Sequence, residues 1–581
     1  MRTLRTLREN STESVIFIDK FSVNALSLNR ANRLFYGVIF SGVNLMETNF
    51  ADHEFLDRAK LPVSINDFET MRTQGYVYVD KTPYIYRMVT QGKFYFLSRP
   101  RRFGKSVLIT TLKCLYEGRK KLFEGLWIAE QGKWDWQKHP VVLLDFTGIS
   151  NDTPEHLQQG LETCLLRIAG EYDIQLKSPL LMSKFTELIL GLSQQTGMSV
   201  AVLIDEYDKP IIDHLGKGPQ EFTIAKANRD VLKRFFGVLK DVTIAPKLQF
   251  IFLTGVTRFS KVSIFSELNN LDDISMHDAY AALLGYTQEE LERYFTPYIR
   301  QLSEHLNWSE EQVLAKLAEQ YNGYRFAESE IKVYNPCSIL KCLNLKKFDD
   351  FWFETATPTF LINVLKQMDF YLPDIEGVQV SKTIFSTFDI EQLEPTALLF
   401  QTGYVTITDV QGRLYTLAYP NQEVRRAFTE SLLLSLTREA QQDVNSHVLR
   451  LTEYLRHEDF DAFFETMTAI FAAIPYDIES KRDEAYFHAL FYLMLTASGA
   501  DARSSVLTCK GRIDMAVFFP NLTYIIEFKC NQHPEAALQQ IHDKGYAEPY
   551  RADGKPIILI GIEFSPEQRN IVAWKVEHFK A

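Results

Sequence analysis

Four short apolar runs separated by helical stretches constrain the fold of this chain more than any other feature of its sequence. The runs cover residues 94–97, 141–146, 200–204 and 248–253. Compact apolar runs of this kind are typical of strands buried on both faces of a parallel sheet, with helices supplying the crossovers. We therefore expect residues 61–285 to form an α/β domain in which helices flank a parallel sheet.

A phosphate-binding loop is predicted where the first of these strands meets the following helix. Residues 98–106 read Ser-Arg-Pro-Arg-Arg-Phe-Gly-Lys-Ser. In a P-loop, backbone N–H groups cradle phosphate oxygens, the Lys reaches the β- and γ-phosphates and the Ser hydroxyl holds Mg²⁺. Gly104, Lys105 and Ser106 occupy those positions, although Arg99 stands where G-x-x-x-x-G-K-[ST] has its first Gly. Gly-Lys-Ser alone also fits an ordinary helix start with basic neighbours.

Two later strands carry polar residues at their C-terminal ends, where ligands bind in open α/β sheets. The run at 200–204 is followed by Asp205 and Glu206. We expect Asp205 to hold Mg²⁺ and Glu206 to polarise the water that attacks the γ-phosphate. The fourth run leads into Thr254 and Arg258, which are candidates for sensing the γ-phosphate and for stabilising transferred charge, in the same or a neighbouring subunit. A Thr-Gly pair after a strand also fits a plain turn.

The remaining sequence divides into three further regions. Residues 1–60 are an N-terminal extension with a five-residue period of large apolar side chains, as in a pentapeptide-repeat β-helix, although coincidence explains so short a pattern equally well. Residues 286–450 predict a mostly helical middle or lid region with one hairpin, formed by 404–407 and 414–417. Residues 451–581 read as helix, two strands, helix and a final strand, which indicates a small α/β domain.

A second group of chemically active side chains lies on the two C-terminal strands. Glu527 and Lys529 are two residues apart and so share one strand face, and a hairpin partner would bring Asp514 to that face. Two carboxylates suit Mg²⁺ binding, and a nearby lysine can position or deprotonate water for phosphodiester hydrolysis. Glu484 is a candidate for a further carboxylate, and Gln540 for orienting the site. Taken alone, an E-x-K pair usually marks a solvated strand face.

The predicted α/β domain at residues 61–285 resembles the bacterial AAA-ATPase-like family. The motifs that carry the resemblance are R-P-R-R-F-G-K-S at 99–106, I-D-E-Y-D at 204–208 and Y-N-G-Y-R-F at 321–326. The loop is shared within this family, so the resemblance makes Arg99 a family trait. It implies nucleotide binding through Gly104, Lys105, Ser106 and Asp205. The full set of expected ATP contacts is Arg101, Arg102, Gly104, Lys105, Ser106, Thr254 and Arg258, with Ser106 and Asp205 on Mg²⁺.

The C-terminal region is similar to the PD-(D/E)XK nuclease superfamily, in the version that follows an AAA-ATPase-like module. The shared motifs are G-R-x-D at 511–514, I-E-F-K at 526–529, A-L-x-Q-I at 537–541 and K-x-Y at 544–546. The resemblance implies a restriction-endonuclease-like α/β domain. No expected catalytic residue type is missing, so we expect a domain competent for cleavage.

Composition limits the partners and the compartment. Lys plus Arg is 63 and Asp plus Glu is 74, a net charge of -11, which excludes a protein that binds polyanions by bulk charge. Residues 451–581 hold 13 basic and 19 acidic residues, so another region or subunit is expected to grip nucleic acid. The apolar runs are shorter than the roughly 20 residues that span a bilayer, and the cysteines show no zinc or disulfide pattern. We expect a cytoplasmic protein without membrane contact.

Two predicted sites for magnesium-phosphate chemistry in one chain indicate an ATP-dependent or ATP-regulated nuclease. ATP and Mg²⁺ are the expected cofactors, and nucleic acid is the expected partner, DNA before RNA. A homo-oligomer is left open. One alternative is a nucleotide-switched binding or signalling protein whose C-terminal fold recognises a partner without cutting. Another is a structural scaffold that uses neither site.

Overall fold

A computed structural model describes most of the chain from residue 59 onward. The described ranges are 59–258, 271–352, 359–367, 375–386, 390–436, 441–474, 484–508 and 510–579. The predicted pentapeptide-like period therefore lies outside the described residues. Within them, no helix combines the length and the apolar character that crossing a membrane requires.

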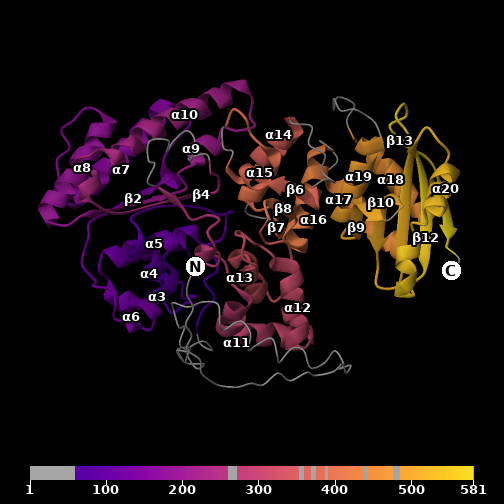
Figure 1. Cartoon of the computed structure of the whole chain (residues 1–581), viewed down its shortest axis with the longest axis horizontal. Helices are drawn as coiled ribbons and strands as arrows, with labels where there is room; N and C mark the ends of the chain where they lie inside the picture. The colour runs from indigo at the N-terminus through magenta and orange to yellow at the C-terminus, as the bar shows by residue number, and fades with distance from the viewer. Residues whose placement is uncertain are drawn as a thin grey trace, which may run out of the picture. The chain divides into compact units, whose positions relative to one another are not determined.

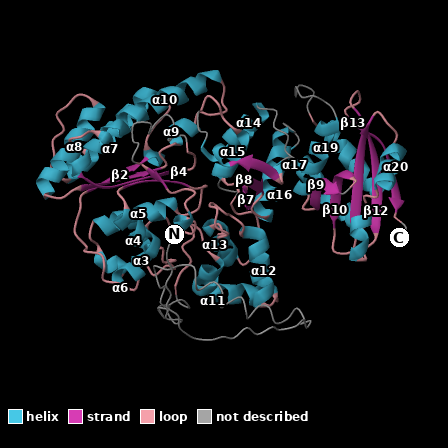
Figure 2. Ribbon diagram, viewed as in Figure 1, coloured by secondary structure: helices cyan, strands magenta, loops and turns pink. Residues whose placement is uncertain are grey.

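The parallel sheet predicted for residues 61–285 is present, with strand order β2-β3-β4-β1-β5. Helices α7, α8 and α10 lie on one face of the sheet and α4 and α5 on the other (Figures 1 and 2). The elements are α3 (Phe68–Thr73), α4 (Thr82–Gln91), β1 (Phe94–Ser98), α5 (Lys105–Tyr116), α6 (Trp127–Glu130), β2 (Val141–Asp145), α7 (Pro154–Glu171), α8 (Leu181–Thr196), β3 (Val200–Asp205), α9 (Lys209–Ile212), α10 (Pro219–Gly237), β4 (Leu248–Gly255) and β5 (Asp272–Asp273).

The four apolar runs become β1 to β4, because their side chains are buried on both sheet faces. Every residue of β3 is buried, and β4 is buried except at Gln249. The parallel registers bring the C-terminal ends of the strands to one edge, where Ser98 is level with Gly255 and Asp145 with Asp205. The strand between β1 and β3 in the sheet is β4. The C-terminal ends of β1, β3 and β4, which lead into the residues predicted to bind nucleotide, are therefore neighbours.

The middle region is mostly helical, as predicted, and carries one small antiparallel sheet of order β6-β8-β7. Its elements are α11 (Gln288–Leu306), α12 (Glu310–Tyr321), α13 (Pro336–Leu345), α14 (Thr359–Gln367), β6 (Val378–Ser381), α15 (Pro395–Thr402), β7 (Thr406–Gln411), β8 (Leu414–Ala418) and α16 (Gln422–Leu436). The predicted hairpin corresponds to β7 and β8, and Gly412 supplies the positive φ of its turn. Strand β6 was not predicted from the sequence.

The C-terminal region forms a mixed sheet of order β13-β12-β11-β10-β9. Its elements are α17 (Gln441–Arg456), α18 (Phe460–Ala472), α19 (Glu484–Ala497), β9 (Asp501–Thr508), β10 (Gly511–Phe518), β11 (Thr523–Cys530), α20 (Pro534–Lys544), β12 (Ile557–Ser565) and β13 (Asn570–His578). Helix α20 packs on one face of the sheet, and α18 and α19 lie on the other side (Figure 1). The structure adds β9 and a second late strand to the predicted order.

The Y-N-G-Y-R-F motif joins the middle region to the predicted phosphate-binding loop. Tyr324 and Phe326 pack edge-on against Phe103 of the loop, with ring centroids 4.8 and 5.3 Å apart. Gly323 has φ +104°, and a Cβ at this position would lie 1.9 Å from the carbonyl oxygen of Pro420. Only glycine avoids both the backbone strain and the overlap, so this junction explains the glycine of the motif.

We expect Gly323→Ala to lower the free energy of unfolding by about 1–3 kcal/mol, because the added methyl group meets a backbone oxygen that cannot move alone. Urea denaturation followed by circular dichroism measures the change. Gly170→Ala in α7 is the matched control, since a Cβ there meets no atom within 4 Å. Equal denaturation midpoints for the two variants would contradict the expectation.

Candidate functional site

The predicted phosphate-binding loop is the turn between β1 and α5, which contains two residues with positive φ. Gly104 precedes the first residue of α5 and has φ +96°, and a Cβ there would meet no atom within 4 Å. Arg102 also has a positive φ, of 69°. The N–H groups at the start of a helix have no carbonyl partner within that helix, an arrangement that favours an anion. The side chains of Arg101 and Arg102 are exposed beside it.

Lys105 is held inside this loop. Its ammonium group donates to the carbonyl oxygens of Arg99 at 3.2 Å and Pro100 at 3.3 Å. It also lies 3.4 Å from a carboxylate oxygen of Glu206, the residue predicted to polarise water. An ammonium group has three donors, and two of them are directed at these carbonyl oxygens, so phosphate oxygens would compete with the carbonyls for Lys105. The role of Lys105 at the nucleotide phosphates stays a prediction.

Ser106 and Asp205, predicted as a magnesium pair, are in direct contact. The Ser106 hydroxyl donates to Oδ2 of Asp205 at 2.7 Å. Burial raises the pKa of Asp205 to about 6, and the carboxylate of Glu206 contributes to the rise. Hard oxygen ligands gathered in a desolvated, acidic position fit Mg²⁺, which would offset the cost of burying their charge. The residues present therefore fit this metal.

Thr254 and Arg258 have other partners. Thr254 is fully buried, and its hydroxyl donates to the carbonyl oxygen of Leu97 in the neighbouring strand at 2.8 Å. Arg258 is also buried, where its guanidinium forms an ion pair with Asp273 and donates to the carbonyl oxygen of Phe385 at 2.7 Å. These contacts favour roles in joining strands and regions over the predicted roles at the γ-phosphate.

Arg99 stands where the G-x-x-x-x-G-K-[ST] pattern has its first glycine, and its side chain is buried. Its guanidinium donates to the carbonyl oxygens of Ser98 at 2.9 Å and Ser275 at 2.6 Å. It also lies over the ring of Phe326, 4.3 Å from the centroid. Burial lowers its pKa to about 9. Arg99 thus braces the start of the loop against the segment after β5 and against the middle region.

Asp208, two residues after Glu206, is a carboxylate that the sequence analysis did not single out. It is fully buried, and one carboxylate oxygen accepts hydrogen bonds from the backbone N–H groups of Val256 and Thr257 and from the Thr257 hydroxyl. Burial raises its pKa above the ordinary range. Its contacts tie the end of β4 to the segment after β3. The signal available in the sequence was its place in the I-D-E-Y-D motif.

In the C-terminal domain, Asp514 lies where strands β10 and β11 separate. The regular pairing ends at Met515 and Ile526. Beyond it, the Asp514 carboxylate accepts a hydrogen bond from the N–H of Phe528 at 3.0 Å, a group that a backbone carbonyl would otherwise satisfy. The N–H of Asp514 lies 3.5 Å from a carboxylate oxygen of Glu527. Both predicted carboxylates therefore meet at this fork.

Glu527 is the most buried member of the fork, with 1% of its surface exposed. Its carboxylate accepts a hydrogen bond from the Gln540 amide of α20 and lies 3.5 Å from the ammonium group of Lys529. Burial and the neighbouring Asp514 raise the pKa of Glu527 well above its usual value, while Lys529 acts in the opposite sense. A pair of carboxylates with a single lysine partner leaves negative charge to be offset, so this site also fits Mg²⁺.

Glu484 is the remaining carboxylate predicted for this site. It is the first residue of α19, and its side chain is exposed. Among the residues that the structure describes, no group of three or more His, Cys, Asp or Glu side chains has the geometry of a metal site. The fork therefore offers Asp514 and Glu527 as its carboxylate ligands, and a contribution from Glu484 stays a prediction.

The glycine of the G-R-x-D motif is explained by the tyrosine of the K-x-Y motif. A Cβ on Gly511 would lie 2.7 Å from the hydroxyl oxygen of Tyr546. Tyr546 itself is buried in the core between the sheet and α20. The two motifs thus fix the start of β10 against α20, the helix that carries Gln540.

We expect nucleotide-free protein to bind Mg²⁺ at the fork, and Asp514→Asn to weaken this binding by at least about tenfold, because one charged ligand is lost. Isothermal titration calorimetry measures the affinity. Asp543→Asn is the control, since Asp543 lies exposed on α20 and accepts from Gln539. Equal affinities for the wild type and Asp514→Asn would contradict a metal site at the fork.

Comparisons with known proteins identify the families of the two domains that carry these residues. Residues 62–265 match the family model described as a predicted AAA-ATPase, and residues 482–574 match that of the PD-(D/E)XK nuclease superfamily. A relative described as an uncharacterized protein in the vnfD 5′ region of Azotobacter chroococcum mcd 1 is 38% identical over 534 residues, which cover 90% of this chain and 99% of the relative. The chain belongs to the family of predicted AAA-ATPases that carry a C-terminal PD-(D/E)XK nuclease superfamily domain.

Proposed function

We propose that this protein is an ATP-binding, ATP-hydrolysing enzyme whose nucleotide state regulates a Mg²⁺-dependent nuclease. The observation that carries the proposal is the fork of β10 and β11, which gathers Asp514, Glu527 and Lys529. The contact between Ser106 and Asp205 supports the nucleotide half of the proposal. Both arrangements suit phosphate chemistry, and they occur in one chain.

At the fork, Asp514 and Glu527 would hold the metal ion. When bound, Mg²⁺ would stabilise the negative charge that develops on a scissile phosphate. Lys529 lies close enough to the Glu527 carboxylate to orient or deprotonate a water molecule beside it. Gln540 fixes the Glu527 carboxylate through a hydrogen bond and so sets its direction. This division of roles follows from which side chains touch.

At the loop, Lys105 and the N–H groups of α5 would bind the nucleotide phosphates, with Ser106 and Asp205 on Mg²⁺. Glu206 is placed beside Lys105 with its side chain 25% exposed, so it can reach a water molecule at the γ-phosphate. Arg101 and Arg102 are exposed at the same loop and can reach phosphate oxygens. Nucleic acid, DNA before RNA, is the proposed substrate of the fork.

A second candidate function is a nucleotide-switched binding protein that recognises its partner without cleavage. The excess of acidic residues over basic ones in 451–581 favours this alternative, because it weakens a domain's grip on a polyanion. The intact set of side chains at the fork favours cleavage. The two functions differ in one measurable step, the cleavage of nucleic acid.

We expect a saturating ATP concentration with Mg²⁺ to stabilise the wild type, by about 2.7 kcal/mol at 100 times the dissociation constant. Lys105→Met should abolish most of this gain, because the ammonium group that meets the phosphates is removed. Thermal denaturation with and without ATP measures the difference. Lys113→Met is the control, since this lysine lies on α5 with its side chain 41% exposed. An unchanged ATP effect in Lys105→Met would refute nucleotide binding at this loop.

We expect Mg²⁺-dependent cleavage of DNA or RNA, and a loss of at least about 100-fold in rate for Asp514→Asn and Lys529→Met. Gel assays on labelled single- and double-stranded substrates measure the rates. Lys575→Met on β13 is the control, because it removes a lysine side chain that pairs with Glu535 instead of with a residue of the fork. Cleavage that survives Asp514→Asn would sink the nuclease assignment, and no cleavage by the wild type would favour the binding alternative.

A further inference from the structure

The first turns of α16 contact both halves of the molecule. Glu423 and Arg426 hold the segment 350–352, and Arg425, between them in sequence, reaches the C-terminal domain. A short stretch of one helix therefore touches a segment next to the phosphate-binding loop and the sheet that carries Asp514.

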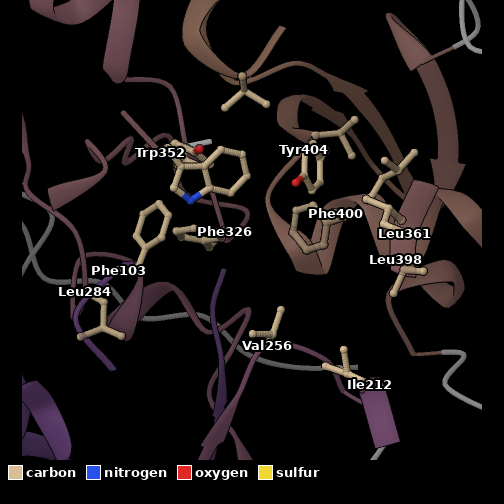
Figure 3. Close-up of a cluster of buried hydrophobic side chains, with 14 of the residues drawn as sticks. Phe103, Ile212, Val256, Leu284, Phe326, Trp352, Leu361, Leu398, Phe400 and Tyr404 are labelled. Carbon is tan, nitrogen blue, oxygen red and sulfur yellow. The ribbon is translucent and has the colours of Figure 1, made fainter. Parts of the chain in front are cut away.

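The contact toward the loop runs through Trp352. The indole N–H of Trp352 donates to the carbonyl oxygen of Arg101 at 3.2 Å. Its backbone N–H donates to Glu423 at 2.8 Å, and the second oxygen of Glu423 accepts from the Ser338 hydroxyl at 2.7 Å. Trp352 and Glu423 are both buried. Figure 3 shows the indole beside Phe103 and Phe326.

Arg426 fixes the same segment at a second point. Its guanidinium donates to the two carboxylate oxygens of Asp350, at 2.7 and 2.5 Å. A two-point contact of this kind specifies direction as well as distance. The position of the indole against the loop is therefore set by α16, and the polar contacts of Glu423 and Arg426 would resist a shift of this segment.

The contact toward the nuclease domain runs through Arg425. This buried guanidinium donates to the carbonyl oxygen of Ala502 and pairs with Asp501 at 3.5 Å and Glu376 at 3.1 Å. Asp501 and Ala502 open strand β9, which pairs along β10. On β9, Ser505 has φ +55° and lies at the level of Asp514, where the regular ladder is interrupted.

A nucleotide would change the forces on the loop. In the structure, three consecutive carbonyl oxygens of the loop accept donors: those of Arg99 and Pro100 from Lys105, and that of Arg101 from Trp352. Phosphate oxygens at the start of α5 would compete for the ammonium group of Lys105 and release two of these three carbonyls. A ligand shifts a conformational equilibrium only through such differential contacts.

We propose that the start of α16, residues 423–426, couples the nucleotide state of the phosphate-binding loop to the nuclease fork, with Trp352 as the contact on one side and Arg425 on the other. This inference rests on the proposed nucleotide binding and not on cleavage. Trp352 and Arg425 are positioning residues in it, because neither touches a reacting atom.

Hydrogen exchange of the amides of β9 in the full chain tests the coupling without any cleavage. A non-hydrolysable ATP analogue with Mg²⁺ is expected to change exchange in β9 by at least about fivefold in the wild type, the lower end of typical allosteric couplings. Trp352→Phe keeps the aromatic packing and removes the indole donor, so the change should fall to less than about twofold while the analogue still raises the melting temperature. Trp574→Phe, on β13 and stacked on Phe464, should behave as the wild type.

Arg425→Lys supplies a second test, because it keeps a buried positive charge but cannot serve Ala502, Asp501 and Glu376 together. It should also suppress the response of β9. If the analogue binds to the wild type and β9 does not respond, or if both variants respond in full, the coupling through α16 is wrong, while nucleotide binding at the loop and the nuclease assignment stand. If the analogue does not bind to the wild type, the proposed nucleotide function fails and the coupling with it.

Discussion

Both candidate sites depend on carboxylates that buried strands hold away from water. Asp205 ends β3 and Glu527 lies in β11, and burial raises the pKa of each. Lys105 and Lys529 offset part of this buried charge. A divalent cation would offset the rest, so the same desolvation that weakens the unliganded sites prepares them for a metal.

Regular elements carry the residues that could be predicted from the sequence. Strand periodicity places Glu527 and Lys529 on one face, and the carboxyl ends of parallel strands meet at one edge, so the contact between Ser106 and Asp205 follows from pattern alone. Strands β9 and β13 were missed because their alternation is weak: β9 leaves Arg503 and Leu507 exposed and most of its other residues only half-buried.

The remaining contacts depend on residues far apart in the chain, so no local pattern reports them. The partner of Arg258 is Asp273, but its guanidinium also reaches Phe385, 127 residues away. Trp352 meets Arg101 across 251 residues. A polar residue after a strand looks the same in sequence whether it faces a ligand or a neighbouring region. In the folded protein, tertiary packing buries the side chains of both Thr254 and Arg258.

The Asp514 side chain does the work of a backbone carbonyl where β10 and β11 part, since it accepts from the N–H of Phe528. An asparagine could accept the same hydrogen bond without bringing a negative charge. A single nucleotide change in an aspartate codon can produce that substitution, so the negative charge of Asp514 and the shape of the sheet are separable over evolutionary time. A descendant of this domain can therefore lose the carboxylate charge in one mutation and still keep the fold of the sheet.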